Sequence, residues 1–291
     1  VADGEVKLWK MGDAFPEGLR WALKANDTYF IAHNAAFEYM IWNEIMHKRY
    51  GWPELPLSLL HCTMAKAYAM AMPGSLENAA LAAGLSVGKD TEGRALMVQM
   101  AKPRKINPDG TILWWDSQEK RERLYQYCKN DIIVERELDK RLLDLNPRER
   151  AVWLQDQIIN QRGVPLDIDS ILRALSTIEK EKDRLDQDMR DATDGYVTST
   201  RSVQDLTDYA AWINGVPMES MAKADIKTAL ERIDLPNAVR QALLIRQEGA
   251  KSSTAKLQAM ADGASRDLRV RGILQYHGAG TGRWAGRKLQ P

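Results

Sequence analysis

The spacing of apolar residues changes at Asn146-Pro147, and this change divides the chain into two halves of different construction. Before it, short β-branched and aromatic runs alternate with stretches of helical spacing, which is typical of an α/β domain. After it, the apolar spacing is mainly helical. The residues Ile171, Leu175, Ile178, Leu185, Met189 and Ala192 predict one long amphipathic helix over 170–193, ended by Gly195. A chain of 291 residues can hold two modest domains.

The first half predicts an edge strand at residues 5–9 and a buried strand at 28–32. Helices are expected at about 35–47, 75–84 and 117–143. The stretch 102–115 contains Asn107-Pro108 and Asp109-Gly110, which indicates a hairpin-like insertion. In the second half we expect a helix at 148–160, a short strand near 164–167, more helices to about residue 260, and a strand at 268–275.

Composition excludes several classes of protein. Hydrophobic residues make up 44% and charged residues 28%, as in an ordinary globular domain. No apolar run approaches about 18 residues, so no membrane span is expected. The N-terminus lacks the pattern of a signal peptide. Cys62 and Cys128 have no metal-ligand spacing, and we interpret them as free thiols in a reducing compartment.

Charge is unevenly distributed although the net charge is only +1. Residues 240–291 hold ten Lys and Arg against three Asp and Glu, a net +7, and the remainder carries −6. A basic segment on a mildly acidic body suits a surface that follows a polyanion. A solvated basic face is the alternative interpretation.

Two motifs of the first half carry chemistry. His33-Asn34-Ala35-Ala36-Phe37-Glu38 lies at a predicted strand-to-helix junction, and Tyr127-Cys128-Lys129-Asn130-Asp131 lies on a predicted helix. Spacing of four places the Tyr127 phenol and the Asp131 carboxylate on one helix face. Carboxylates are the ligands that Mg²⁺ prefers, and metal-dependent phosphodiester hydrolysis usually needs two such ions.

The two motifs resemble those of the 3′–5′ proofreading exonuclease domains of DNA polymerases. Asn34-x-x-x-Glu38 is similar to the second exonuclease motif, and Tyr127-x-x-x-Asp131 to the third motif of the tyrosine subclass. Two further segments, 73–78 and 89–93, resemble phage polymerases of this kind. The resemblance implies an RNase H-like fold with a mixed sheet. It also implies catalytic roles for Glu38, Tyr127 and Asp131, metal binding by Glu38 and Asp131, and DNA contact by Asn34.

The sequence departs from the family pattern at two points. The second motif ends in Glu38 where the family has Asp, so this ligand is one methylene longer. The first motif, Asp-x-Glu on a leading strand, is absent; Asp3-Gly4-Glu5 has the right letters without the flanking apolar residues. His33 is expected to be structural, and Trp114 and Trp115 to be packing or hairpin residues.

The second half carries its densest signals near the end. Lys251, Ser253, Thr254 and Lys256 lie in a run of short hydroxyl side chains and cations that suits contact with phosphates. The Gly-rich run at 278–282 is not a Walker loop, because no Gly-Lys-Ser/Thr follows.

The order of these segments resembles the passage from thumb to palm in family A DNA polymerases. Lys-Ser-Ser-Thr-x-Lys-Leu at 251–257, a strand, Tyr276-His277 and Thr281-Gly282-Arg283 follow in the family's order. The resemblance implies contacts with primer-template DNA by Thr281 and Arg283. It also implies an incomplete exonuclease domain without its leading strand at 1–146, a helical thumb at 147–265 and the start of a palm at 266–291.

Taken together, the sequence predicts a fragment of a phage-type family A polymerase that replicates DNA and uses two Mg²⁺ ions, with Mn²⁺ as a substitute. Expected partners are primer-template DNA, single-stranded 3′ ends, and missing polymerase parts or replisome proteins, in the cytosol of a bacterial host. Without the palm carboxylates, the chain is not expected to synthesise DNA.

The alternatives to this prediction are a non-catalytic primer-template binding module that needs a separate chain, and a free-standing exonuclease of the RNase D sort. The thumb-like segments argue against the latter.

Overall fold

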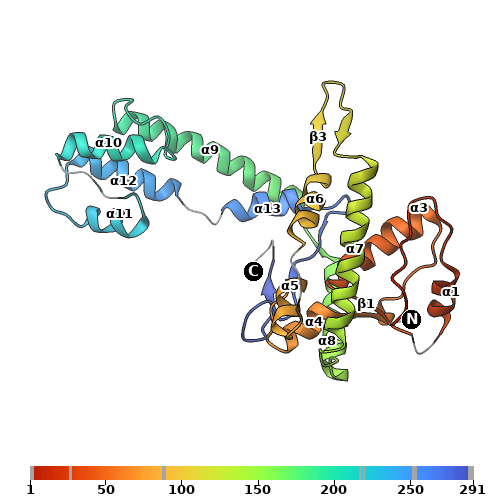
Figure 1. The fold of residues 1–291 in the computed structure, drawn as a ribbon. Coiled ribbons are helices and arrows are strands. Elements are labelled where there is room, and N and C mark those ends of the chain that lie inside the picture. The colour runs from red at the N-terminus through yellow and green to blue at the C-terminus, as the bar shows by residue number, and fades with distance from the viewer. Residues whose placement is uncertain are drawn as a thin grey trace. The chain divides into compact units, whose positions relative to one another are not determined.

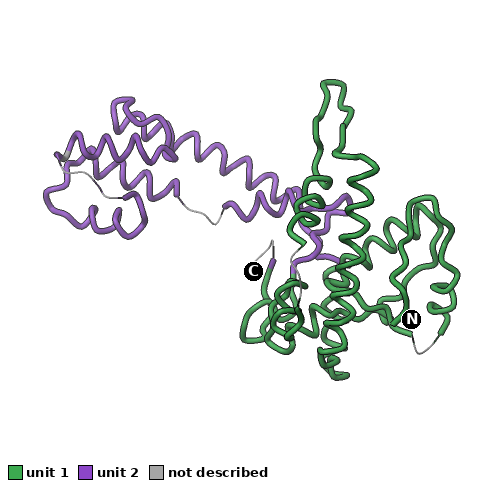
Figure 2. Tube along the Cα trace, in the orientation of Figure 1, with its two compact units in different colours: residues 1–161, 274–286 green, residues 162–273, 287–291 purple. Residues whose placement is uncertain are grey.

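The computed structural model describes residues 3–25, 28–86, 90–215, 218, 220–250 and 254–287. The chain forms two compact units (Figure 2): Val1–Gln161 with Leu274–Gly286, and Arg162–Ile273 with Arg287–Pro291. Helices predominate in both units, and the strands are short, so the chain is a mixed α/β protein. Within the described ranges, no helix is both long enough and apolar enough to cross a membrane.

The elements of the first unit follow one another along the chain in Figure 1. They are α1 (Glu17–Lys24), β1 (Phe30–Ala32), α2 (Ala35–Met40), the π-helix η1 (Ile41–His47), α3 (Lys48–Tyr50), the 3₁₀ turn η2 (Leu57–Leu59), β2 (Leu60–Cys62), α4 (Thr63–Ala69), α5 (Leu76–Ala82), α6 (Thr91–Met100), β3 (Pro103–Ile106), β4 (Ile112–Trp114), α7 (Gln118–Asp139), α8 (Pro147–Arg162), β7 (Leu274–Gln275) and β8 (Ala285–Gly286).

Strands of the first unit pair in twos. β1 and β2 are parallel, with Phe30 opposite Leu60 and Ala32 opposite Cys62. β3 and β4 form the antiparallel hairpin that the sequence predicts, and β7 pairs with β8. No sheet formed by the described residues has more than two strands, so the expected mixed sheet is not seen among them.

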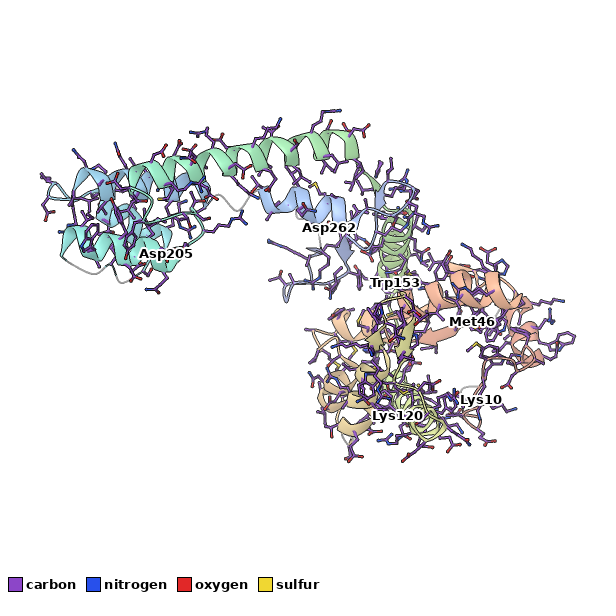
Figure 3. All side chains as sticks on the ribbon, turned by 90° about the horizontal axis from the view of Figure 1, so that it is seen from above. Lys10, Met46, Lys120, Trp153, Asp205 and Asp262 are labelled. Carbon is purple, nitrogen blue, oxygen red and sulfur yellow. The ribbon has the colours of Figure 1, made fainter. Side chains whose placement is uncertain are left out.

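The core of the first unit is built around the parallel strands β1 and β2. Leu55, Leu60 and Ala35 pack with Trp153 of α8 and with Tyr276, which follows β7. Trp153 is labelled in Figure 3. A second cluster joins α4, α5 and α7 through Ala67, Ala79, Leu138 and Leu142. These contacts hold the β1–α2 junction and α7 within one unit.

The second unit is a helical assembly with one short strand pair. Its elements are β5 (Val164–Pro165), α9 (Ile168–Ala192), α10 (Val203–Asn214), α11 (Lys223–Leu230), α12 (Asn237–Gly249), α13 (Ala255–Gly263) and β6 (Arg269–Val270). Met189 of α9, Leu206 of α10, Ile226 of α11 and Leu243 of α12 meet in its core. The long amphipathic helix is confirmed as α9, whose N-cap Asp167 accepts a hydrogen bond from the Ser170 amide at 3.0 Å.

Two of the predicted strands are wrong. Residues 5–9 form no strand, because Trp9 instead packs edge-on against Trp52 and Tyr50, with ring centroids 5.2 and 5.6 Å apart. The strand expected at 268–275 is broken into β6 and β7, which pair with different partners. Gly272 lies between them at φ +64°, a left-handed conformation outside the extended backbone of a regular strand.

Candidate nuclease site

The junction between β1 and α2 presents the first predicted motif. Asn34 is the N-cap residue of α2 at φ +62°, in the left-handed region that Asn tolerates better than most residues. His33 is structural, as predicted: its Nδ1 lies 2.9 Å from Thr63 Oγ1, and its Nε2 lies 2.9 Å from the Gly74 carbonyl oxygen. Burial lowers the pKa of His33, so it is neutral. Both ring nitrogens of His33 are engaged in these contacts. Glu38 is therefore the titratable side chain of this motif that is left to act in the site.

Glu38 lies in the first turn of α2. Its side chain reaches solvent, yet the protein around it desolvates the carboxylate and raises its pKa above the ordinary value.

The second predicted motif lies on α7, where Tyr127 and Asp131 are one turn apart on the same face. The Tyr127 hydroxyl donates a hydrogen bond to Asp131. Desolvation raises the pKa of Asp131, while this hydrogen bond opposes the rise. Desolvation and the neighbouring Asp131 also raise the pKa of Tyr127, so the phenol stays protonated. The pair therefore offers a fixed hydroxyl beside a carboxylate.

Asp90, which precedes α6, and Gly93 in its first turn lie next to Tyr127. Asp90 caps α6 by accepting a hydrogen bond from the Gly93 amide at 2.8 Å, and it forms an ion pair with Arg123 of α7. A β-carbon at Gly93 would lie only 2.4 Å from the Tyr127 ring. Glycine at this position therefore lets the ring pack directly against the α6 backbone.

Glu135 joins the site and was missed by sequence reasoning. It lies one turn beyond Asp131 on α7 and is only 9% exposed. Desolvation, followed by the charges of Glu38, Asp139 and Asp131, raises the pKa of Glu135 to about 8. The backbone amide of His33 donates to its carboxylate, while Oε1 has no hydrogen-bond partner. In a helix rich in charged residues, its i+4 spacing from Asp131 was the signal that could have found it.

The charges of both motifs act on Glu135. Glu38 of α2 and Asp131 of α7 each disfavour the ionised form of this buried carboxyl group, so Glu135 is influenced by both motifs. Within the ranges that the structure describes, no three His, Cys, Asp or Glu side chains are arranged to hold a metal ion. Asp3 of the N-terminal segment instead forms an ion pair with Lys140, with Nζ and Oδ1 2.9 Å apart.

Apart from Asn34, the predicted DNA contacts belong to other elements. Thr281 and Arg283 are exposed in the loop between β7 and β8. Tyr276 anchors this loop by donating to Glu149 of α8 at 2.8 Å, and Gly282 turns it at φ +77°. Thr254 and Lys256 lie at the start of α13 in the second unit, and Lys251 and Ser253 lie outside the described residues.

Comparison with known proteins relates the chain to DNA polymerases. No protein-family model matches the chain. Along nearly its whole length, however, the chain is related to a phage DNA polymerase. That relative is the DNA polymerase of Bacillus phage SP02, which is 33% identical over an alignment of 299 residues that covers 99% of this chain. The chain spans 44% of the length of that polymerase.

Proposed function

We propose that this chain is part of a family A DNA polymerase, and that its first unit is a 3′–5′ proofreading exonuclease with an RNase H-like fold. The observation that carries the proposal is that Glu38 of α2 and Asp131 of α7 both act on the buried Glu135, while Tyr127 is hydrogen-bonded to Asp131. The similarity to a phage polymerase supports it and extends through both units, which disfavours a free-standing exonuclease.

The donor set fits hard divalent cations in its chemistry. Glu38 and Asp131 supply carboxylate oxygens, and the buried Glu135 Oε1 lacks a partner. Glu38 and Asp131 would hold a Mg²⁺ ion, which when bound would lower the pKa of an attacking water and offset phosphate charge. Because the described residues include no three-ligand group, binding by these residues alone would be weak.

The chain's own residues would do the positioning. The Tyr127 hydroxyl, whose proton is donated to Asp131, would accept a hydrogen bond from the attacking water and so orient it. Asn34, exposed at the start of α2, would contact the terminal nucleotide.

The test uses the complete gene product and a 5′-labelled single strand. Asp131→Asn and Glu38→Gln should reduce 3′–5′ digestion at least 100-fold while primer extension continues. Glu119→Gln, an exposed carboxylate in the first turn of the same helix, is the matched control and should change neither activity. Undiminished digestion by Asp131→Asn would refute the assignment.

The absence of a three-ligand group among the described residues favours a second candidate, a primer-template binding module without catalysis of its own. It predicts duplex binding by the complete product with no digestion under any metal condition.

A further inference from the structure

The β3–β4 hairpin is a surface that the proposed exonuclease site does not use. Every residue of both strands is exposed, including Ile106 at 65% and Trp114 at 50%. Figure 1 shows the hairpin projecting beyond the helices of its own unit. Such a hairpin has no core of its own, and two strands alone are marginally stable in water.

Local contacts fix both ends of the hairpin. At the tip, Asn107 donates to Thr111 twice, from its backbone amide to the carbonyl oxygen and from its side-chain amide to the hydroxyl, and Gly110 turns the chain at φ +81°. At the base, Arg104 lies over the Trp115 ring at 5.0 Å, and Lys120 of α7, labelled in Figure 3, lies 5.9 Å from the same ring. Trp115 is therefore a packing residue, as predicted. The contacts at the tip and at the base together fix the conformation of β3 and β4.

The pairing places apolar side chains together on one face. Ile106 lies opposite Ile112, and Trp114 lies opposite Pro103. Because side chains alternate along a strand, Ile112 and Trp114 share a face. This is an exposed apolar strip that ends in a half-exposed indole.

Cations lie close to this strip in the hairpin, although Lys105, which is opposite Leu113, belongs to the other face. Lys102, Arg104 and Lys105 are all exposed, whereas the acidic residue of the hairpin, Asp109, accepts hydrogen bonds from Thr111 in the turn. Lysines are depleted from protein–protein interfaces, but cations beside an aromatic platform are the usual means of binding single-stranded nucleic acid.

The hairpin lies within reach of the proposed active site. It leads directly into α7, and Tyr127 lies nine residues after the first residue of that helix. At 1.5 Å per residue this is about 14 Å along the helix, or roughly four nucleotides at the spacing of a stacked strand.

We propose that the hairpin binds the single strand a few nucleotides to the 5′ side of the terminus held at Tyr127, with bases stacking on Trp114 and phosphates beside Lys102. This inference rests on the proposed exonuclease function for the position of the terminus. It assigns a binding role to Trp114, which the sequence led us to regard as a packing or hairpin residue.

The test measures binding, with EDTA present to prevent digestion. The full chain is titrated with a labelled oligo-dT of about 12 nucleotides, with a trinucleotide, and with a blunt duplex. Trp114→Ala should weaken binding of the longer single strand about tenfold or more, while the trinucleotide and the duplex are bound as before. Lys102→Ala should weaken it by a smaller factor that shrinks as salt rises.

Trp212→Ala is the matched control, because it removes an exposed indole from the second unit, 70% exposed against 50% for Trp114, and it should leave binding of the single strand unchanged. Equal affinity of wild type and Trp114→Ala for the longer strand would overturn the proposal, as would equal losses with strand and duplex. The proposal would also be overturned if the hairpin bound an unrelated protein while its variants bound the single-stranded DNA as wild type does. Because hydrolysis is blocked, this result is independent of whether Asp131 proves to be catalytic.

Discussion

At the scale of single residues, the site depends on how carboxylates are placed in partly desolvated surroundings. Glu38, Asp131 and Glu135 all have raised pKa values because burial disfavours their charged forms. An arrangement of like charges costs stability when no cation offsets it. Such a cost is expected at a site built for a cation and is hard to explain otherwise.

Glu135 should make folding stability depend on pH. Its pKa rises from about 4.5 to about 8 in the folded chain, so its stabilising contribution is complete below 4.5 and is lost as the pH rises through 8. We expect Glu135→Gln to be more stable than wild type at pH 8, by on the order of 2–4 kcal/mol, and to differ much less at pH 5.

Urea unfolding in EDTA at the two pH values would measure this difference. Asp156, whose pKa burial raises to about 6, titrates in both proteins and should leave part of the pH dependence in place. If wild type and variant fall in parallel between pH 5 and 8, the buried state of Glu135 is wrong.

Gly93 should act through Tyr127. In Gly93→Ala, the new methyl would lie 2.4 Å from the ring, so the Tyr127 ring, whose hydroxyl is bonded to Asp131, must shift. Because displacements of about 1 Å at a catalytic group cost up to 100-fold, we expect digestion by the complete gene product to fall about 10- to 100-fold with primer extension intact.

Gly18→Ala is the control for Gly93→Ala, since it is also in a helix and a β-carbon there meets no atom within 4 Å. Equal rates for Gly93→Ala and Gly18→Ala would show that the ring's position does not matter.

At the scale of elements, α4 is held to α7 by a buried cation. Lys66 of α4 is 4% exposed, and its Nζ lies 2.7 Å from Asp139 of α7 and 2.6 Å from Asp144. Burial opposes its charge, but the two carboxylates outweigh this and raise the pKa of Lys66. The interaction fixes the end of α7 beyond Glu135.

Removing this cation should therefore destabilise the first unit. Lys66→Met leaves Asp139 partly buried without its partner, so we expect a loss of about 2–4 kcal/mol in the free energy of unfolding. Lys48→Ala, which breaks an exposed ion pair with Glu44, should cost less than about 1 kcal/mol. Chemical denaturation measures the free energy of unfolding of the two variants. Similar losses in both would contradict a structural role for the buried pair.

How much of this the sequence predicts depends on the element. Long periodic helices such as α7 and α9 were predicted, because the apolar spacing is repeated over many turns. Local turn chemistry predicted the hairpin as well. The conformation at Trp9 was not predictable, because it is set by distant Trp52 and Tyr50. Glu135 was missed for the same reason: its burial depends on α2, and within α7 it reads as one more surface charge.

At the scale of the whole chain, the basic segment 240–291 should govern binding to duplex DNA. Removing one cation that binds a phosphate should reduce the log–log salt slope of binding by about one, so Lys256→Ala and Arg283→Ala should each flatten it without base preference. Lys227→Ala, an exposed lysine outside the segment, is the control. A titration from low to moderate salt measures the slope, and identical slopes in all four proteins would locate DNA binding elsewhere.

The last prediction concerns hydrolysis by residues 1–291 alone. Two Mg²⁺ ions close together need several anionic oxygens to offset their charge and to fix an in-line geometry. Glu38 and Asp131 cannot supply them, Glu135 is largely protonated at neutral pH, and no third ligand is in place among the described residues. We therefore expect this chain to digest a labelled single strand with Mg²⁺ or Mn²⁺ at least 100-fold more slowly than the complete gene product. A longer chain that adds an Asp-x-Glu strand should recover the activity, and in it Asp131→Ala should abolish digestion while Tyr127→Phe weakens it and leaves Mn²⁺ binding intact. Rapid digestion by residues 1–291 that Asp131→Ala removes would mean that the missing carboxylates are already present in this chain, with Asp3 and Glu5 the first to test.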